Sequence, residues 1–219
     1  MIDGIQIKVC GLTSLVDADF ADACGADHLG FVLHAKSPRH VSLAQFRSMA
    51  GRLPERHKVA VDVEPGSDAL LAMRDAGFDR FQVHFRHDLP ASSIEAWSRA
   101  VGAGNLWLAP KLPPGVDVPD AWLGLARCVL MDTFDPTLFG GTGRTGDWPK
   151  FRRHSERHPG KTWILSGGLS PENVGDALAG TGARFVDVNR GVESAPGVKD
   201  HSRLKAFVAA VHKAAGRRA

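Results

Sequence analysis

The feature that most constrains this chain is a regular alternation of short apolar segments with longer segments of helical spacing. The apolar segments are rich in β-branched residues, and the segments between them carry apolar residues three and four positions apart. The expected strands are 5–10, 28–33, 58–63, 80–84, 106–110, 128–132, 162–165 and 185–188, and the expected helices are 15–24, 43–53, 68–76, 92–101, 120–125, 148–157, 171–179 and 199–214. Eight strand–helix pairs in 219 residues predict a single (β/α)8 TIM barrel, one domain spanning residues 1–219.

The competing architecture is an open, doubly wound sheet. Such a sheet usually has fewer strands and often carries a G-x-G-x-x-G turn after the first, which this chain lacks. Most expected strands are nearly continuous apolar runs, as when both faces of a parallel sheet are buried. The proline-rich segment 110–115 is interpreted as a rigid loop, because a domain boundary there would leave two incomplete sheets. The pattern therefore favours the barrel.

Charge and cysteine content argue against several classes of function. The formal net charge is only +3, and lysine and arginine are scattered except in the tail 213–218, so a nucleic-acid partner is not expected. Cys10, Cys24 and Cys128 are too few for a disulfide framework, and none belongs to a CxxC pair, so a metal site is not expected. We find no signal-peptide pattern and no apolar run of the ~18 residues that a membrane helix needs. These features predict a cytoplasmic protein without a membrane partner.

Two expected strands end in side chains capable of proton transfer. A TIM barrel carries its functional groups at the carboxyl ends of its strands. The first strand ends at Cys10 before a glycine, and the sixth ends at Asp132 before the long glycine-rich segment 134–146, which is typical of a loop that closes over substrate. A thiol and a carboxyl group at equivalent ends suggest a base and an acid facing one site. Two alternatives stay open: a free cysteine is often a small buried hydrophobe, and a strand-end aspartate can cap the next loop.

Other polar residues at strand ends are candidates for substrate binding, namely Lys8, Arg39, Gln82 and His84. Lys8 shares its strand face with Cys10, and a positive neighbour would help a thiol with an ordinary pKa near ~8.5 to ionise. Lys8 is equally well interpreted as a structural charge inside the barrel mouth. Arg39 could hold a carboxylate with two parallel hydrogen bonds. Gln82 and His84 share one face of the fourth strand, and each alone also fits a satisfied core polar residue.

Three glycine-containing turns follow the last three strands, at 140–143, 166–173 and 189–193. Glycines let backbone N–H groups approach an anion, and the loops after strands seven and eight usually form the phosphate site of a TIM barrel. We therefore expect a phosphate cradle here. Its candidate residues are Gly141, Thr142, Gly143, Gly167, Gly168, Arg190 and Gly191.

These residues also carry a family resemblance. The segment 8–13 reads K-V-C-G-L-T and resembles the K-[IV]-C-G-[IL]-T signature of phosphoribosylanthranilate isomerase. Further similar motifs lie, in order, at 25–27, 30–32, 37–41, 81–84, 130–133, 141–143, 147–148, 166–173, 186–188, 191–193 and 196–200. The motifs span essentially the whole chain, which makes the resemblance specific.

The resemblance implies an activity and a role for several residues. It implies the conversion of N-(5-phosphoribosyl)anthranilate into 1-(2-carboxyphenylamino)-1-deoxyribulose 5-phosphate, an Amadori rearrangement in tryptophan synthesis that needs no cofactor. It implies that Cys10 is the general base, Asp132 the general acid and Arg39 the contact for the anthranilate carboxylate. It assigns the phosphate to Gly141, Thr142, Gly143, Gly168 and Gly191. The expected partner is thus a phosphoribosyl small molecule, and the expected assembly is a monomer or a homodimer.

Three positions depart from the family pattern. Asp62 stands where an aromatic residue is usual, Phe85 replaces a glycine, and Arg190 replaces a small serine of the phosphate loop. We expect these changes around the barrel mouth, where they would affect substrate detail; a guanidinium at position 190 could still bind phosphate. The alternatives are therefore a related phosphosugar enzyme with a shifted substrate and a non-catalytic phosphate-ligand binding protein. The presence of both Cys10 and Asp132 argues against the binder, which needs neither a base nor an acid.

Overall fold

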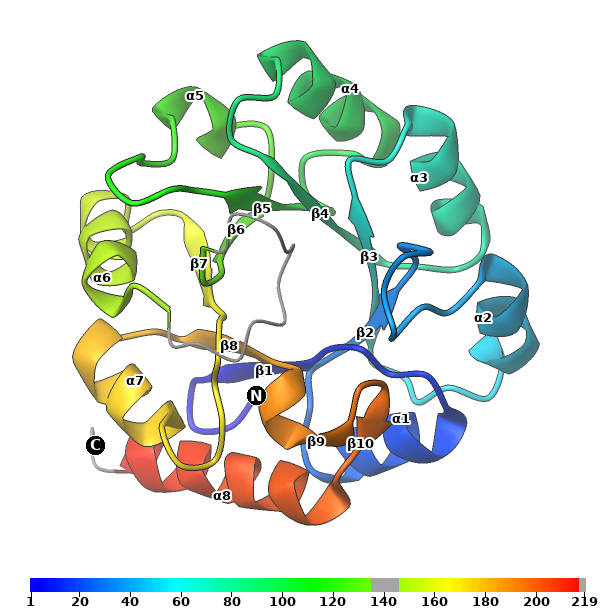
Figure 1. The fold of residues 1–219 in the computed structure, drawn as a ribbon, viewed down its shortest axis with the longest axis vertical. Coiled ribbons are helices and arrows are strands. Elements are labelled where there is room, and N and C mark those ends of the chain that lie inside the picture. Colours follow the sequence, from blue (N-terminus) through cyan, green and yellow to red (C-terminus); the bar gives the residue numbers. More distant parts are fainter. Residues whose placement is uncertain (135–145, 217–219) are drawn as a thin grey trace.

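The computed structural model describes residues 1–134 and 146–216. Within them, parallel strands β1 to β8 close into a barrel in sequence order, and β8 pairs with β1 (Figure 1). The strands are β1 (Gln6–Val9), β2 (His28–Val32), β3 (His57–Val63), β4 (Arg80–Arg86), β5 (Leu106–Lys111), β6 (Cys128–Met131), β7 (Thr162–Leu165) and β8 (Phe185–Val188). The helices are α1 (Leu15–Ala23), α2 (Leu43–Ala50), α3 (Ser67–Asp75), α4 (Ala91–Val101), α5 (Asp120–Leu123), α6 (Trp148–Arg157), α7 (Val174–Thr181) and α8 (His201–Gly216). The predicted (β/α)8 barrel is confirmed.

Short polar caps set where the first helices begin after their strands. The Ser14 hydroxyl accepts a hydrogen bond from the backbone N–H of Asp17 at the start of α1. Ser42 and Gln45 form a reciprocal capping box at the start of α2. Each cap satisfies N–H groups that the first helical turn leaves without a partner. The caps therefore fix where the loops after β1 and β2 end and the helices begin.

The helix expected over 171–179 starts later than the sequence suggests. α7 begins at Val174, and the residues before it form a turn. The side-chain Oδ1 of Asn173 accepts from the Ser170 N–H at 2.8 Å, and its Nδ2 donates to the Gly168 carbonyl at 2.9 Å. These side-chain bonds stabilise the turn in competition with a helix.

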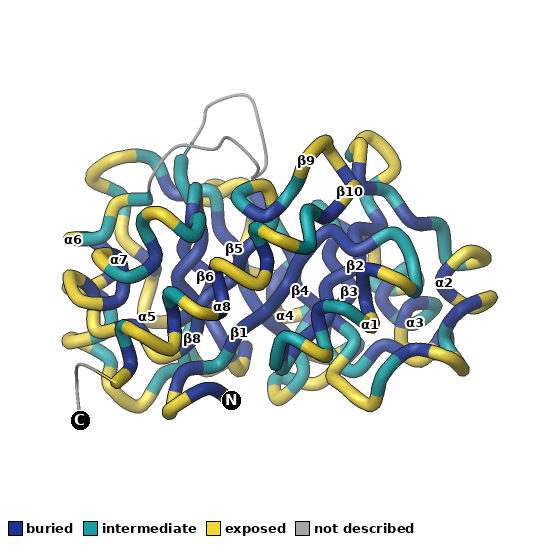
Figure 2. Tube along the Cα trace, turned by 90° about the horizontal axis from the view of Figure 1, so that it is seen from below, coloured by how far each residue is buried: buried dark blue, intermediate teal, exposed yellow. Residues whose placement is uncertain are grey.

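The helix expected over 199–214 also begins later, because α8 starts at His201 after a hairpin that the sequence pattern did not predict. A 3-10 turn η1 (Arg190–Val192) leads into β9 (Glu193–Ala195), which pairs antiparallel with β10 (Val198–Lys199). Figure 2 shows this hairpin at the end of the barrel opposite the N-terminus, where the strands have their carboxyl ends. The hairpin therefore lies at the mouth of the barrel.

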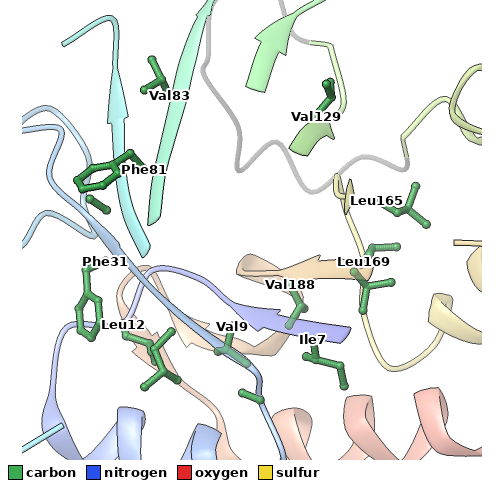
Figure 3. Packing of buried hydrophobic residues seen from close by; sticks show 14 of the residues in the cluster. Ile7, Val9, Leu12, Phe31, Phe81, Val83, Val129, Leu165, Leu169 and Val188 are labelled. Atoms are coloured by element: carbon green, nitrogen blue, oxygen red, sulfur yellow. The ribbon is translucent and has the colours of Figure 1, made fainter. Parts of the chain in front are cut away.

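Strand side chains alternate between two buried layers. Ile7 and Val9 pack in the outer layer between the sheet and the helices (Figure 3). The positions between them face the barrel interior, which holds a separate buried cluster. That cluster consists of Cys10, Val32, Val59, Val61, Trp107, Ala109, Cys128, Leu130, Ile164 and Phe185. The interior is thus a packed core, with polar groups concentrated at its mouth.

A neutral histidine lies buried near the amino-terminal ends of the strands. His28 is stacked between His57 and Phe185, with ring centroids 5.2 and 5.0 Å away, and meets Trp107 edge-on. Among the described residues, its Nδ1 has no hydrogen-bond partner. Burial, with the charges of His57 and Lys8 adding to it, lowers the pKa of His28 to about 3. The folded barrel therefore holds this imidazole in its neutral form.

We predict that His28 makes the fold sensitive to acid. The unfolded chain takes up a proton near pH 6.5, whereas the folded chain does so only near pH 3. Stability that is present above pH 6.5 is therefore lost as the pH falls toward 3, by about 2 kcal/mol between pH 7 and pH 5. His28→Phe preserves the ring stacking but has no group that titrates. Its free energy of unfolding, measured with urea, should therefore fall less between pH 7 and pH 5 than that of the wild type. His87→Gln, at an exposed position after β4, is the matched control and should behave like the wild type. An unchanged pH dependence in His28→Phe would contradict the prediction.

Candidate active site

β1 places two polar side chains inside the barrel mouth. Lys8 and Cys10 lie on the inward face of the strand, with relative exposures of 0% and 4%. Room for them comes from Gly30 on the neighbouring β2. A Cβ atom at Gly30 would lie 2.9 Å from Cε of Lys8 and 3.1 Å from Sγ of Cys10, closer than side chains normally approach. Gly30 therefore allows the ammonium and the thiol to share one space.

Lys8 is held by an ion pair across the seam of the barrel. Its Nζ donates to Oδ1 of Asp187 at 2.9 Å, and the two residues are in register in the β1–β8 pair. Burial favours the neutral amine, but Asp187, and then the Cys10 sulfur, outweigh it, so the pKa of Lys8 is raised. Lys8 therefore stays a cation although it is fully buried.

Burial raises the pKa of the Cys10 thiol above its ordinary value. The charge of Lys8 and its hydrogen bond to the sulfur oppose this, and Asp187 acts in the same direction as burial. The expected Lys8–Cys10 partnership is thus present, yet it does not lower the thiol pKa below normal. Cys10 is consequently a thiol at neutral pH in the free protein, and its thiolate, once formed, is a strong base.

Asp132 follows β6 and has the properties of a proton donor. Burial is the main reason that its pKa is raised to about 6, while the N–H of Thr133, which donates to Oδ1 at 2.8 Å, opposes the shift. Gly167 (φ +92°) packs directly on these two residues, since a Cβ there would lie 3.1 Å from Oδ1 of Asp132 and would overlap Thr133. The glycine expected in the phosphate cradle thus makes room for the acid.

Gln82 and His84 lie on the same face of β4, as their parity predicted. Nε2 of Gln82 lies 2.8 Å from Nε2 of His84. Burial, reinforced by the charge of Lys8, lowers the pKa of His84 to about 3. The imidazole is therefore neutral and accepts the amide hydrogen bond. Among the described residues, Oε1 of Gln82 has no partner, which leaves it available to a hydroxyl group in the mouth.

Arg39, in the loop after β2, meets a carboxylate of the chain itself. Its Nε donates to Oε1 of Glu193 at 2.8 Å, and its Nη2 donates to Oε2 at 2.6 Å. The two-pronged grip expected for a substrate carboxylate is therefore occupied by Glu193. A Cβ at Gly11, the residue after Cys10, would lie only 2.7 Å from Cδ of Arg39, so the arginine passes directly over the end of β1.

The loops after β7 and β8 meet, as expected of a phosphate cradle. Gly168 (φ +62°) lies in the first loop, and Gly191 in the second packs so closely on the Leu169 carbonyl that a Cβ would overlap it. Arg190 begins the short helix η1 beside them and is exposed. The remaining cradle candidates, Gly141, Thr142 and Gly143, and most of the loop 134–146 lie outside the described residues.

The three departures from the family pattern do not all lie at the mouth. Phe85 is fully buried in the outer layer and packs edge-on against Trp97 and Trp122, so the expectation for it was wrong. Side chains alternate along β4, and Gln82 and His84 occupy its inward positions. Phe85 therefore points outward, toward the helices. Asp62 also lies at an outward-facing position of its strand, and its Oδ1 lies 3.5 Å from Nδ1 of His34. Only Arg190 lies on a loop expected to contact phosphate.

The sequence reading missed several polar residues of the mouth: Asn189, Glu193 and Lys199, and the role of Asp187. Asp187 gave one usable signal, because it is a charged residue inside the apolar run 185–188. No group of three or more His, Cys, Asp and Glu within residues 1–134 and 146–216 is placed to hold a metal ion. In the same residues, no helix is long and apolar enough to cross a membrane.

Comparison with known proteins identifies relatives along nearly the whole chain. The N-(5'-phosphoribosyl)anthranilate isomerase of Cellvibrio japonicus is 39% identical over 210 residues, 93% of this chain and 92% of that protein. A phosphoribosyl anthranilate isomerase in complex with reduced 1-(o-carboxyphenylamino)-1-deoxyribulose 5-phosphate has a TM-score of 0.75 and 29% identity, covering 95% of this chain and 98% of its own. The structure of generated monomers of the dimeric isomerase from Thermotoga maritima gives a TM-score of 0.73 and 30% identity, with 95% and 98% coverage.

The family model described as N-(5'phosphoribosyl)anthranilate (PRA) isomerase matches residues 7–210. This match begins within β1 and ends within α8, so it includes most of β1, the other seven barrel strands and the hairpin β9–β10. The chain therefore belongs to the N-(5'-phosphoribosyl)anthranilate isomerase family.

Proposed function

We propose that this protein converts N-(5'-phosphoribosyl)anthranilate into 1-(2-carboxyphenylamino)-1-deoxyribulose 5-phosphate in tryptophan biosynthesis, with Asp132 as general acid and Cys10 as general base. The observation that carries the assignment of roles is the pair of environments at one barrel mouth. A half-buried carboxyl group has its pKa raised to about 6, and a buried thiol lies against the ammonium group of Lys8. Family membership supplies the reaction to which these roles belong.

The acid step opens the sugar ring. Protonated Asp132 gives its proton to the ring oxygen of the ribose while the C1–O bond breaks. The nitrogen lone pair of the anthranilate forms a double bond to C1, and an iminium ion results. A carboxyl group that keeps its proton up to about pH 6 serves this step better than an ordinary aspartate, because more of it is protonated near neutrality.

The base step moves hydrogen from C2 to C1. The reactive form of the site is the one in which the single proton of the pair lies on Asp132 and Cys10 is a thiolate. The Cys10 thiolate removes the C2 proton, and the electron pair of that bond forms the C1–C2 double bond of an enaminol. Loss of the O2 proton and gain of a proton at C1 then give the aminoketone. C2 is oxidised as C1 is reduced, so the reaction balances within the substrate and needs no redox cofactor. The raised pKa of Cys10 suits the removal of a weakly acidic carbon-bound proton.

The remaining site residues are proposed to bind substrate. Gly168, Arg190 and Gly191, together with Gly141, Thr142 and Gly143, would hold the phosphate, since the two described loops meet where backbone N–H groups can approach an anion. Gln82 and the neutral His84 would contact sugar hydroxyl groups, and Arg39 the anthranilate carboxylate. Lys8 would stabilise the thiolate.

The location and assembly of the protein are part of the proposal. A charged phosphate ester does not cross membranes unaided, so we place the enzyme in the cytoplasm with the supply of its substrate. A monomer and a homodimer both suit a site built within one barrel. The Arg190 substitution favours one alternative, a shift to another phosphosugar, which a direct assay would reveal.

The central test is turnover of freshly prepared phosphoribosylanthranilate, followed by the loss of its fluorescence. Cys10→Ser and Asp132→Asn should each lower kcat by at least ~10²-fold, since each removes a positioned proton-transfer group. Cys24→Ser, at the half-buried C-cap of α1, should keep wild-type activity. Wild-type activity in either Cys10→Ser or Asp132→Asn would refute the assigned roles. Phosphosugar binding without any turnover would support the binding-protein alternative.

We also predict the pH dependence of kcat/KM, which reports on the free enzyme. Between about pH 6 and the raised pKa of Cys10, the Asp132–Cys10 pair carries one proton, as the reaction requires. Below pH 6 the pair gains a second proton, and above the thiol pKa it loses the last one. The profile should therefore rise up to about pH 6, stay level and fall in alkali.

Asp132→Asn separates the two limbs of this profile. The variant has no carboxyl group to titrate, so its residual kcat/KM should lack the limb near pH 6 and instead rise toward alkaline pH with formation of the Cys10 thiolate. Survival of the limb near pH 6 in this variant would show that another group causes it.

A further inference from the structure

A buried cluster of charges joins the hairpin β9–β10 to the loop after β2. Glu193, 2% exposed at its side chain, receives three hydrogen bonds from the Nε and Nη2 atoms of Arg39 and one from Lys199, whose Nζ lies 3.0 Å from Oε1. Lys199 has a fully buried side chain and also donates to Oδ1 of Asn189 at 3.0 Å. The Gly197 N–H approaches Oε1 of Glu193 at 3.3 Å. One carboxylate thus organises two cations from separate loops.

The cluster carries one excess positive charge. Burial lowers the pKa of Lys199, but the charge of Glu193 and its hydrogen bond oppose that shift and favour the ammonium form. Arg39 and Lys199 then contribute two positive charges, and Glu193 contributes one negative charge. Burial alone would raise the pKa of Glu193, but its hydrogen bonds from Arg39 and the charge of Lys199 lower it, so the carboxylate stays ionised. An uncompensated buried cation is costly unless an anion meets it. The cluster is therefore complementary to an anionic group in the mouth.

The geometry decides which part of Arg39 can meet that anion. Glu193 accepts hydrogen bonds from Nε and Nη2, and no described residue accepts a hydrogen bond from Nη1. Gly11 lies directly beneath both Arg39 and Asn189, since a Cβ there would meet Cδ of Arg39 at 2.7 Å and Oδ1 of Asn189 at 2.6 Å. The guanidinium is thus fixed against the residue that follows Cys10, and within residues 1–134 and 146–216 its Nη1 end has no partner.

We infer that Glu193 and Lys199 are positioning residues that hold Arg39 so that its Nη1 end, and not its Nε edge, binds the carboxylate of the substrate. This inference rests on the function proposed above. Lys199 fixes one oxygen of Glu193, Glu193 fixes the plane of the guanidinium, and the excess charge is compensated when the substrate binds. Neither Glu193 nor Lys199 needs to touch the substrate.

Glu193→Gln tests the inference at constant side-chain volume. Four donors converge on the two oxygens of Glu193, from Arg39 Nε and Nη2, Lys199 Nζ and the Gly197 N–H. A glutamine amide offers one acceptor and one donor, so it cannot keep both bonds to Arg39. The guanidinium should then lose its fixed orientation while the barrel stays folded.

The measurement is calorimetric binding of two ligands to wild type and variant. One is reduced 1-(2-carboxyphenylamino)-1-deoxyribulose 5-phosphate, the ligand in a related isomerase structure, and the other is the same molecule without its carboxylate. Wild type should prefer the carboxylate ligand by about tenfold or more, and Glu193→Gln should lose most of this preference with less than about threefold change for the ligand without it. Lys199→Met should lose part of the preference. Glu156→Gln, which removes an exposed Arg–Glu pair on α6, is the matched control and should behave like wild type.

The outcomes separate this inference from the proposed function. Retention of the carboxylate preference in Glu193→Gln, or equal weakening of both ligands with an intact fold by circular dichroism, would overturn the positioning role. A wild type that turns over phosphoribosylanthranilate but shows no carboxylate preference would overturn the inference and leave the function standing. A wild type that neither turns over substrate nor binds either ligand would overturn the function, and the inference with it.

Discussion

The ion pair between Lys8 and Asp187 joins the closure of the barrel to its chemistry. It forms where the first strand meets the last, at a position where β1 and β8 are in register. Burying two charges is expensive, and the cost is offset only when the partners meet with good geometry. A slip of one residue would turn Lys8 to the outer layer and leave Asp187 without its partner in the interior. The pair therefore fixes the register of the seam, and through it the place of Cys10 two residues along β1.

The environment, and not the residue type, distinguishes the two thiols inside the barrel. Cys10 and Cys128 belong to the same interior cluster, and burial raises the pKa of both, that of Cys128 to about 11. Cys128 begins β6 near the amino-terminal end, whereas Cys10 lies at the mouth, with the ammonium of Lys8 hydrogen-bonded to its sulfur. A thiolate at Cys10 thus has a fixed counter-charge. The same type of side chain therefore packs the core at one end of the barrel and, in the proposed mechanism, acts as the base at the other.

The sequence predicted what depends on local periodicity and missed what depends on distant contacts. Alternation along the strands placed Lys8, Cys10, Gln82 and His84 on inward faces, and the barrel topology brought Cys10 and Asp132 to one mouth. The partner of Arg39 could not be predicted in this way, because Glu193 is 154 positions away and lies in a short hairpin without periodic signal. The strand-end positions of Cys10 and Asp132 suggested a base and an acid, and the family resemblance made these roles and that of Arg39 specific. All three roles stay predictions.

The charges of the mouth explain why a buried site can tolerate so many ionised groups. Lys8 and Asp187 cancel each other, and His84 stays neutral, so the only excess within these groups is the single positive charge of the cluster formed by Arg39, Glu193 and Lys199. That charge lies beside Cys10, and both Lys8 and Lys199 lower the pKa of its thiol. A substrate carboxylate bound to Arg39 would compensate this positive charge, and the pKa of the Cys10 thiol would then be lowered less. In the substrate complex the Cys10 thiolate would therefore be a stronger base than in the free enzyme, at the stage when the C2 proton has to be removed.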